Sequence, residues 1–229
     1  YKRQGYCSRR EADRLIEKGE VWINGTLATM GTKVMPGDTV MVHHTTITPC
    51  QKEYLLAFHK PAGIVCTTSK IDKNNVIDYL NFPERIYPVG RLDKESTGLL
   101  LLTNNGQLMD DILRGSNYHE KEYIVHVNKP ITDSVLQATA QGVPILDTIT
   151  RPCKIRRMGK DCFYITLTQG LNRQIRRMCE YFDYRVTSLK RIRIMNIELG
   201  SLPVGKWREL TTSEIKTLKN LAQNKGEAE

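Results

Sequence analysis

Several features are missing from the 229-residue sequence, and each absence removes a class of protein. No apolar run approaches the roughly 18 to 20 residues that a membrane-spanning helix needs, which argues against a helical membrane protein. The six cysteines form no C-x-x-C pair and have no histidines at zinc spacing, so neither a metal site nor a disulfide framework is predicted. There is no internal repeat and no visible signal peptide, and a cytoplasmic location is expected.

Positive charge is what the sequence has in excess. Lysine and arginine number 34 against 25 acidic residues, which gives a formal net charge of +9. This excess favours a polyanionic partner, because phosphates attract Lys and Arg and binding releases condensed counterions. Nucleic acid is therefore the first partner to consider, in a chain whose 40% apolar residues are typical of a globular protein.

The first 46 residues predict a small helix-and-hairpin module. Ser8 is suited to be the N-cap of a helix, with Glu11 as its capping-box partner, and Gly19 is suited to end that helix. The Asn24-Gly25 pair then predicts a tight hairpin turn, and the Pro-Gly-Asp sequence at 36–38 predicts a second turn.

A polar linker is expected over 47–53, followed by a second domain over 54–223 and a frayed tail over 224–229. The second domain mixes strand-like and helical runs in an irregular order. This order favours an α+β fold with a mixed, mainly antiparallel β-sheet and flanking helices. The expected strands cover 54–58, 86–89, 99–102, 123–127, 163–167 and 192–199. The expected helices cover 107–114, 132–142, 174–182 and 213–223.

The segment from Tyr87 to Gly98 is the first candidate for a reactive site. It lies between two apolar runs, with a glycine on each side of its charged stretch, and such a loop can present a carboxylate at a cleft. A solvated charged turn is the simpler interpretation of the spacing alone. The full stretch YPVGRLDKESTGLLLLTNNG, however, resembles the signature of pseudouridine synthases, in the branch that includes RsuA, RluB, RluE and RluF.

The resemblance continues along nearly the whole chain. Its further matches are KPAGIVCTT from Lys60, EKEYIV from Glu120, LNRQIRRM from Leu171 and RIRIMNIELGSLPVGKWREL from Arg191. The opening CSRREADRLIEKGEVWINGTLA from Cys7 resembles an S4 RNA-binding domain, expected to be incomplete at its N-terminal end. The combination of QGLNRQIRRMCEYF with RIMN is most similar to the RluF subgroup, whose family substrate is a uridine in large-subunit ribosomal RNA.

The resemblance implies four active-site residues. Asp93 of the GRLD element would be the essential catalytic carboxylate, and Arg176 the cation that pairs with it. A carboxylate beneath a flipped base is driven toward neutrality by desolvation, so it needs a fixed positive charge beside it. The resemblance further implies that Tyr123 stacks on the target uracil and that Leu189 packs beside the active site.

The residues themselves also allow simpler roles. Arg176 lies at the edge of a helical apolar stripe over 175–182, where it fits either a cleft or open solvent. Tyr123 shares a strand face with two valines and fits an ordinary core aromatic, as Leu189 fits an ordinary core leucine. The Lys60-Pro61 turn is expected to shape the sheet, with no catalytic role.

Basic residues cluster late in the chain, with twelve lysines and arginines against three acidic residues between positions 151 and 193. The cluster predicts a surface that follows phosphates. The predicted RNA contacts are Arg9, Arg10, Arg14, Arg91, Arg173, Arg177, Lys190, Arg191 and Arg193. The resulting hypothesis is isomerisation of a uridine in 23S ribosomal RNA, with transfer RNA as a further candidate substrate, by a monomer that needs neither cofactor nor metal.

Three other classes of function are alternatives. A non-catalytic S4-type RNA-binding or ribosome-assembly protein would need only the module and the basic surface. An RNA methyltransferase would need a glycine-rich nucleotide loop, and the sequence has no G-x-G-x-G. A glycosidase would need two separated carboxylates, whereas Asp93 and Glu95 are close together on one loop.

Overall fold

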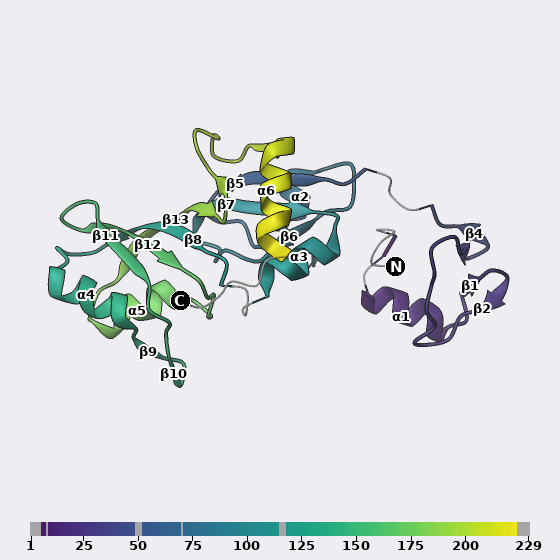
Figure 1. The fold of residues 1–229 in the computed structure, drawn as a ribbon, viewed down its shortest axis with the longest axis horizontal. Helices are drawn as coiled ribbons and strands as arrows, with labels where there is room; N and C mark the ends of the chain where they lie inside the picture. Colours follow the sequence, from purple (N-terminus) through teal and green to yellow (C-terminus); the bar gives the residue numbers. More distant parts are fainter. Residues whose placement is uncertain (1–5, 8, 49–51, 70, 115–117, 224–229) are drawn as a thin grey trace. The chain divides into compact units, whose positions relative to one another are not determined.

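A computed structural model describes residues 6–7, 9–48, 52–69, 71–114 and 118–223 of the chain. The chain divides into two compact units, drawn as ribbons in Figure 1. The first unit comprises Tyr1–Glu53 with Asn104–Gly106, and the second comprises Tyr54–Thr103 with Gln107–Glu229. Each unit has a hydrophobic core of its own.

In the first unit a helix packs on a small antiparallel sheet. Helix α1 (Arg9–Glu17) precedes strands β1 (Val21–Ile23), β2 (Thr26–Leu27), β3 (Val40–Val42) and β4 (Thr45–Thr46), which pair in the order β2-β1-β3-β4. Asn24 and Gly25 both have positive φ, 49° and 79°, as the type I′ turn of a two-residue hairpin requires. The predicted hairpin is therefore confirmed.

The second predicted turn is also present, since the Asp38 N–H donates to the Met35 carbonyl at 3.1 Å. Ile47, expected at the start of the linker, instead packs in the core of the first unit. The predicted N-cap Ser8 lies outside the described residues, as do 49–51 of the expected linker and the whole tail from 224.

The second unit is built on one sheet, which has nine strands in the described part of the chain. Its main order is β11-β12-β8-β13-β7-β5-β15, with β14 beside β13 and β6 beside β7. Every pair is antiparallel except β13 with β7. The predicted mixed, mainly antiparallel sheet is confirmed. The strands are β5 (Leu55–Lys60), β6 (Tyr87–Val89), β7 (Thr97–Thr103), β8 (Lys121–Val127), β11 (Lys154–Arg157), β12 (Cys162–Leu167), β13 (Val186–Ile194), β14 (Ile197–Glu198) and β15 (Trp207–Glu209).

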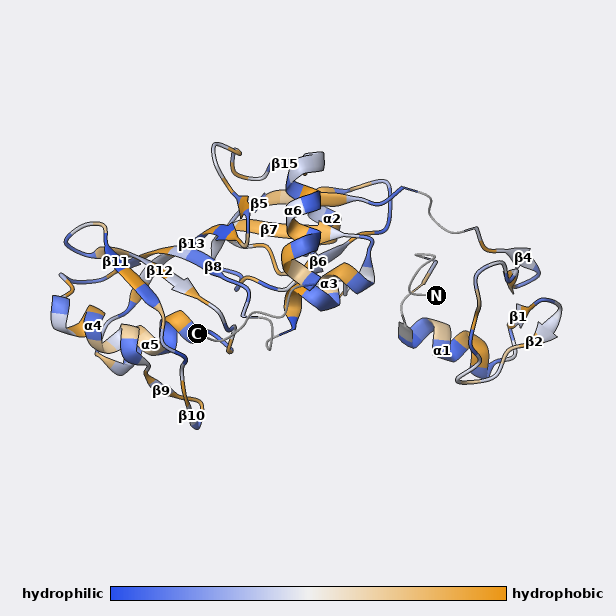
Figure 2. Ribbon diagram, viewed as in Figure 1, coloured by the Kyte–Doolittle hydropathy of each residue, from blue (hydrophilic) through white to orange (hydrophobic). Residues whose placement is uncertain are grey.

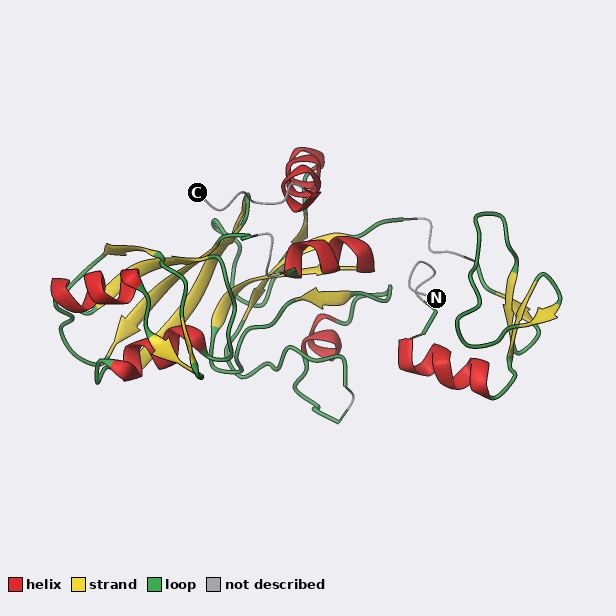
Figure 3. Ribbon diagram, turned by 60° about the horizontal axis from the view of Figure 1, so that its bottom comes forward, coloured by secondary structure: helices red, strands yellow, loops and turns green. Residues whose placement is uncertain are grey.

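Helices cover both faces of this sheet (Figure 3). They are α2 (Val76–Leu80), α3 (Gly106–Leu113), α4 (Asp133–Gln141), α5 (Gln174–Tyr181) and α6 (Thr212–Gln223). Helices α3 and α6 contribute to one core, and α2, α4 and α5 contribute to the other. Strands β5 and β7 are therefore apolar almost throughout (Figure 2), and their successive residues enter the two cores alternately.

One expected strand is wrong. The run over 192–199 is a hairpin: β13 starts at Val186 and ends at Ile194, the chain turns at Met195 with a φ of 52°, and β14 returns antiparallel. The first part of β13 contains lysine and arginine, so its hydrophobic pattern did not indicate a strand. Elements α2, β11, β15 and the separate hairpin of β9 (Pro144–Ile145) with β10 (Thr148–Ile149) are too short for periodicity to predict.

Gly98 permits the close approach of β7 and β13. Its φ is +107°, and a Cβ at this position would lie 2.2 Å from the carbonyl oxygen of Arg191. Only glycine fits such a contact with this backbone conformation. The approach brings β13, with Leu189 and Arg191, next to the strand that follows the Asp93 loop.

Candidate active site

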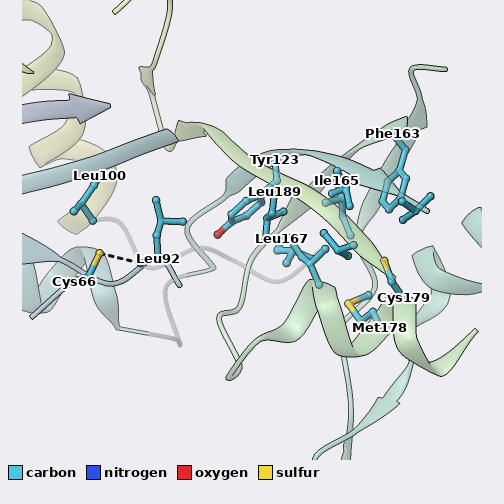
Figure 4. Close-up of a cluster of buried hydrophobic side chains, with 14 of the residues drawn as sticks. Cys66, Leu92, Leu100, Tyr123, Phe163, Ile165, Leu167, Met178, Cys179 and Leu189 are labelled. Carbon is cyan, nitrogen blue, oxygen red and sulfur yellow. Dashed lines mark hydrogen bonds between the residues drawn. The ribbon is translucent and has the colours of Figure 1, made fainter. Parts of the chain in front are cut away.

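Asp93 lies in the loop over 90–96, between β6 and β7. Backbone hydrogen bonds fix this loop on both sides of the carboxylate. The Leu92 N–H donates to Cys66 Sγ at 3.4 Å, drawn as a dashed line in Figure 4, and the Ser96 N–H donates to the Asp93 carbonyl at 3.1 Å. The Asp93 side chain keeps 31% of its surface exposed. The fold therefore presents a carboxylate on a fixed backbone where a ligand can reach it.

Lys60 is fully buried behind the same loop. Its Nζ donates to the carbonyls of Pro61 at 2.8 Å, Lys94 at 3.3 Å and Ser96 at 2.8 Å. Burial lowers the pKa of Lys60, and the three carbonyls match the three donors of an ammonium group. The sequence predicted a role in shaping the sheet, and the contacts show that Lys60 also ties β5 to both sides of the turn that follows Asp93.

Two arginines at the start of α5 approach the Asp93 carboxylate. Arg176 Nε lies 3.5 Å from Oδ2, and Arg173 Nη1 lies 3.9 Å from the same oxygen. The Arg176 side chain is 11% exposed, and its Nη atoms donate to the Val186 carbonyl at 3.3 Å and Ser96 Oγ at 3.4 Å. Its Nε is within ion-pair distance of Asp93 but makes no hydrogen bond to it. The structure brings Arg176 and Asp93 together, as expected.

A cavity of about 710 Å³ opens beside Asp93. Tyr123 of β8 and Leu189 of β13 belong to its wall and to the core behind it. Figure 4 shows the Tyr123 ring beside Leu189, with the hydroxyl directed toward Leu92. Three of the four predicted active-site residues, Asp93, Tyr123 and Leu189, line the cavity. The fourth, Arg176, does not line it but lies within ion-pair distance of the Asp93 carboxylate.

The cavity is also lined by basic residues that the sequence did not predict there, among them His119 and Lys121. Burial, followed by the nearby Arg191 guanidinium, lowers the pKa of Lys121 to about 8. Burial also lowers the pKa of His119. A signal for Lys121 was present in the sequence, because Lys121 precedes Tyr123 by two residues in a strand and must share its face.

Two predicted RNA contacts need correction. Arg191 is 3% exposed and its Nε donates to the Leu99 carbonyl at 2.7 Å, so it cannot belong to a surface that follows phosphates. Arg193 would share its face by simple alternation, but a β-bulge between the two turns Arg193 to the other side of the sheet. There its Nε and Nη2 bind Glu122 and Glu120, each at 2.9 Å.

The remaining predicted contacts have varied positions. Arg91 and Arg173 are exposed and line the cavity. Arg177 is half-buried and donates to the Asn172 carbonyl at 3.1 Å, and Lys190 is half-buried in β13. In the first unit Arg10 and Arg14 are exposed on α1, while the side chain of Arg9 lies outside the described part of the chain.

No helix within the described ranges is long and apolar enough to cross a membrane. Among the same residues, no three His, Cys, Asp or Glu side chains gather in a group that could hold a metal ion. The five cysteines whose structure is described are free thiols, and Cys50 lies outside the described residues.

Comparison with known proteins identifies both units. Residues 54–181 match the RNA pseudouridylate synthase family, and residues 2–40 match the S4 domain. The chain is 52% identical to the dual-specificity RNA pseudouridine synthase RluF of Escherichia coli O6:H1, over 96% of this chain and 77% of that protein. It is 34% identical to the ribosomal large subunit pseudouridine synthase B of Bacillus subtilis, over 96% of this chain and 93% of the relative. A crystal structure of pseudouridylate synthase matches with a TM-score of 0.70 and 28% identity, over 94% of this chain and 95% of that chain.

Proposed function

The chain belongs to the RNA pseudouridine synthase family, as its motifs predicted, and on that premise we propose that it isomerises one uridine of 23S ribosomal RNA. The name of one relative specifies the large ribosomal subunit, and the name of another specifies dual specificity toward RNA. The first name supports large-subunit RNA as the main substrate, and the second supports a further RNA substrate, for which we propose transfer RNA. We further propose that the enzyme acts as a monomer in the cytoplasm.

The observation that carries the proposal is Asp93 at the cavity wall, with Arg176 and Arg173 within 3.9 Å of its carboxylate. Pseudouridine formation breaks the bond between N1 and C1′ and makes a bond between C5 and C1′. One proton leaves C5 and one joins N1, so the atoms and electrons balance without an oxidant or a reductant. An ionised carboxylate assists either by adding to the substrate or by taking a proton from the ribose.

The neighbours of Asp93 have distinct proposed roles. Arg176 holds the carboxylate by its charge, since two unit charges about 4 Å apart attract by roughly 4 kcal/mol at an effective dielectric of 20. Tyr123 stacks on the uracil, and its hydroxyl helps to move the C5 proton. Leu189 packs beside the Tyr123 ring and keeps it in place.

RNA binding is proposed to involve both units. The boundaries we propose are 54–223 for the catalytic domain and, because Ile47 packs in the core of the first unit, 1–47 for the S4 domain and 48–53 for the linker in place of 1–46 and 47–53. In the second unit Arg91 and Arg173 at the cavity, together with Arg177 and Lys190, would contact phosphates near the target. In the first unit the exposed Arg10 and Arg14 of α1 would contact phosphates as well. Such contacts offset the cost of turning the target base out of its stack, which is a few kcal/mol.

The test is tritium release from RNA that carries [5-³H]uridine. The full chain should release one equivalent from large-subunit RNA, and a carbodiimide-dependent stop of reverse transcription should locate the product at one uridine. Small-subunit RNA is the matched control and should release none, while transfer RNA tests the second substrate. Absence of release from large-subunit RNA, assembling large subunits and transfer RNA alike would contradict the proposal and favour an RNA-binding protein.

A further inference from the structure

The cavity is also lined by basic side chains that the mechanism above does not use. They are His119, Lys121 and Arg191, which share the cavity wall with Tyr123. His119 is 8% exposed and Arg191 is 3% exposed. Among the described residues, His119 Nε2 and Arg191 Nη2 have no hydrogen-bond partner. Two buried side chains therefore hold polar nitrogens unsatisfied at the wall of the same cavity.

The register of the sheet places these side chains around one ring. Lys121 and Tyr123 are two residues apart on β8, so they project from the same face. Arg191 lies directly opposite Tyr123 on β13, and its guanidinium carbon is 6.0 Å from the ring centroid. Lys121 Nζ donates to the His119 carbonyl at 3.2 Å, which leaves two of its three donors available.

The two cations of this group lack a carboxylate partner within the described chain, whereas His119 lies near Asp111, whose charge acts to raise its pKa. Neither Lys121 nor Arg191 has an acidic partner within 4.0 Å, and Asp93 is paired with Arg176 and Arg173. A buried charge without a partner is costly, and so is a buried donor without an acceptor. The arrangement is therefore suited to a ligand that brings negative charge and acceptor oxygens.

We propose that His119, Lys121 and Arg191 form an anion pocket for the uracil base while the base is detached from the ribose. The proposal rests on the isomerase function proposed above and names further catalytic residues for it. Lys121 and Arg191 would bind the exocyclic oxygens of the base, next to the ring on which the base stacks.

The depth of the pocket favours the base over a phosphate. A phosphodiester continues into the chain on both sides and must stay near the surface, whereas a flipped base ends in its own edge. Arg191 lines the cavity but is only 3% exposed, so a continuous backbone cannot run along it.

The chemistry requires such a pocket. When the bond between N1 and C1′ breaks, its electron pair stays with the uracil and spreads over N1, O2 and O4. C1′ then either bonds to the Asp93 carboxylate or gains a double bond as C2′ loses a proton to it. The detached anion must be stabilised, kept from leaving and turned until C5 faces C1′. Fixed donors in a water-poor site accomplish this most effectively.

Lys121→Met tests the proposal by separating chemistry from binding. The single-turnover rate at saturating enzyme should fall about a hundredfold, as for loss of one preorganised donor to a developing anion. The dissociation constant for RNA and its salt slope should stay within twofold. Lys121→Arg should restore most of the rate. Lys216→Met, at an exposed lysine of α6 away from the cavity, is the matched control and should match the wild type.

The pH profile gives a readout that a merely structural role would not move. Below about pH 8 Lys121 is charged, so kcat/KM of the wild type should fall as pH rises through that value. Lys121→Arg should move this alkaline limb upward beyond the lysine range. The charged and titratable groups that line the cavity with Lys121 are Arg91, Asp93, Arg114, His119, Tyr123, Arg151, Arg173 and Arg191, and Asp111 acts on His119 from α3.

Each outcome decides between the hypotheses. A Lys121→Met rate within threefold of the wild type, or an alkaline limb unchanged in Lys121→Arg, would overturn the anion pocket and leave the isomerase intact. A weakened affinity with a salt slope reduced by about one would assign Lys121 to a phosphate instead. No turnover by the wild type on any RNA would refute the isomerase itself. If Lys121→Met does not fold, the pH profile of Lys121→Arg decides alone.

Discussion

Strands β8 and β13 lie side by side in the sheet. The arginine on one face of this pair has acidic partners, and the basic side chains on the other face have none within the described chain. On one face Arg193 binds Glu122 and Glu120, each at 2.9 Å. On the other face Lys121 and Arg191 line a cavity, and within the described chain neither has an acidic partner within 4.0 Å. The β-bulge between Arg191 and Arg193 places these two side chains on opposite faces of the sheet.

Pairing with carboxylates decides which of these cations are available to a ligand. Arg193 donates hydrogen bonds to two carboxylates and so has few donors available for a phosphate, and such partly exposed pairs contribute little to stability. A buried cation without an acid weakens the fold, and groups of this kind mark functional sites. A count of lysines and arginines along the sequence does not show which face of the sheet each side chain occupies. Arg191 and Arg193 were therefore both predicted to bind RNA.

The largest expected effect comes from Gly98→Ala, because the cavity face exists only while β13 lies close to β7. A methyl group at this position would lie 2.2 Å from the Arg191 carbonyl oxygen, in a backbone conformation with a φ of +107°. We expect the variant to lose more than about 4 kcal/mol of unfolding free energy, and activity with it. Urea unfolding followed by circular dichroism measures the loss.

Gly159→Ala is the matched control for this substitution. The nearest atom to its added Cβ is 3.8 Å away, which is ordinary contact, so unfolding should change by less than about 1 kcal/mol. If Gly98→Ala proved as stable as the wild type, the close packing of β7 against β13 would be wrong, and the comparison of the two faces with it.

Arg176→Ala should have the next largest effect, on rate rather than on affinity. Without Arg176 the Asp93 carboxylate loses a fixed positive charge 3.5 Å away, and the loop loses a hydrogen bond at Ser96. The single-turnover rate should fall about a hundredfold, while the dissociation constant for RNA stays within threefold. Quenched-flow tritium release and filter binding measure the two quantities.

The neighbouring residue Arg177 is expected to affect RNA affinity and not the rate. Arg177 donates to Asn172 and does not line the cavity, so Arg177→Ala should weaken RNA binding several-fold and leave the saturated rate unchanged. Equal rates for the two alanine variants would remove Arg176 from the mechanism.

The smallest effect is expected for Arg193→Met, on the face where charges are paired. The variant should turn over RNA within twofold of the wild type and lose about 1 kcal/mol of unfolding free energy. Burial raises the pKa of Glu120, but hydrogen bonds from Arg193 and Lys154 outweigh it and lower the pKa below its ordinary value of 4.5. The stabilisation is therefore complete above pH 4.5 and is lost as pH falls through the lowered pKa.

Unfolding of both proteins at several pH values checks this prediction. The difference in unfolding free energy between wild type and Arg193→Met should shrink as pH falls below 4.5. A difference that stayed constant to low pH, or a large loss of turnover, would show that Arg193 does not act as a paired surface cation.

Local signals in the sequence predicted much of the fold. The Asn24-Gly25 turn, the apolar stripe of α5 and the mixed sheet all follow from turn chemistry and periodicity, and all are confirmed. The strand over 192–199 was wrong because its true start lies among basic residues, whose burial depends on pairing with β8. Hydrophobic periodicity carries no information about such pairing.

The site was predictable only in part, and for a different reason. Asp93 was identified by its motif, since the spacing of charges alone favoured a solvated turn. Lys60 was not recognised as an anchor because its three acceptors are backbone carbonyls, two of them more than thirty residues away. The pocket of His119, Lys121 and Arg191 depends on a cross-strand register and a bulge, which no single strand reveals.

The role of Asp93 is tested by comparing Asp93→Asn with Glu95→Gln in the tritium-release assay. Both substitutions remove one negative charge from the same loop, and Glu95 is the more exposed residue, with 64% of its side chain accessible. We expect Asp93→Asn to lose more than about a thousandfold in rate with RNA affinity retained, and Glu95→Gln to stay within threefold of the wild type. Substantial release by Asp93→Asn would show that this carboxylate is not the group that carries out the isomerisation.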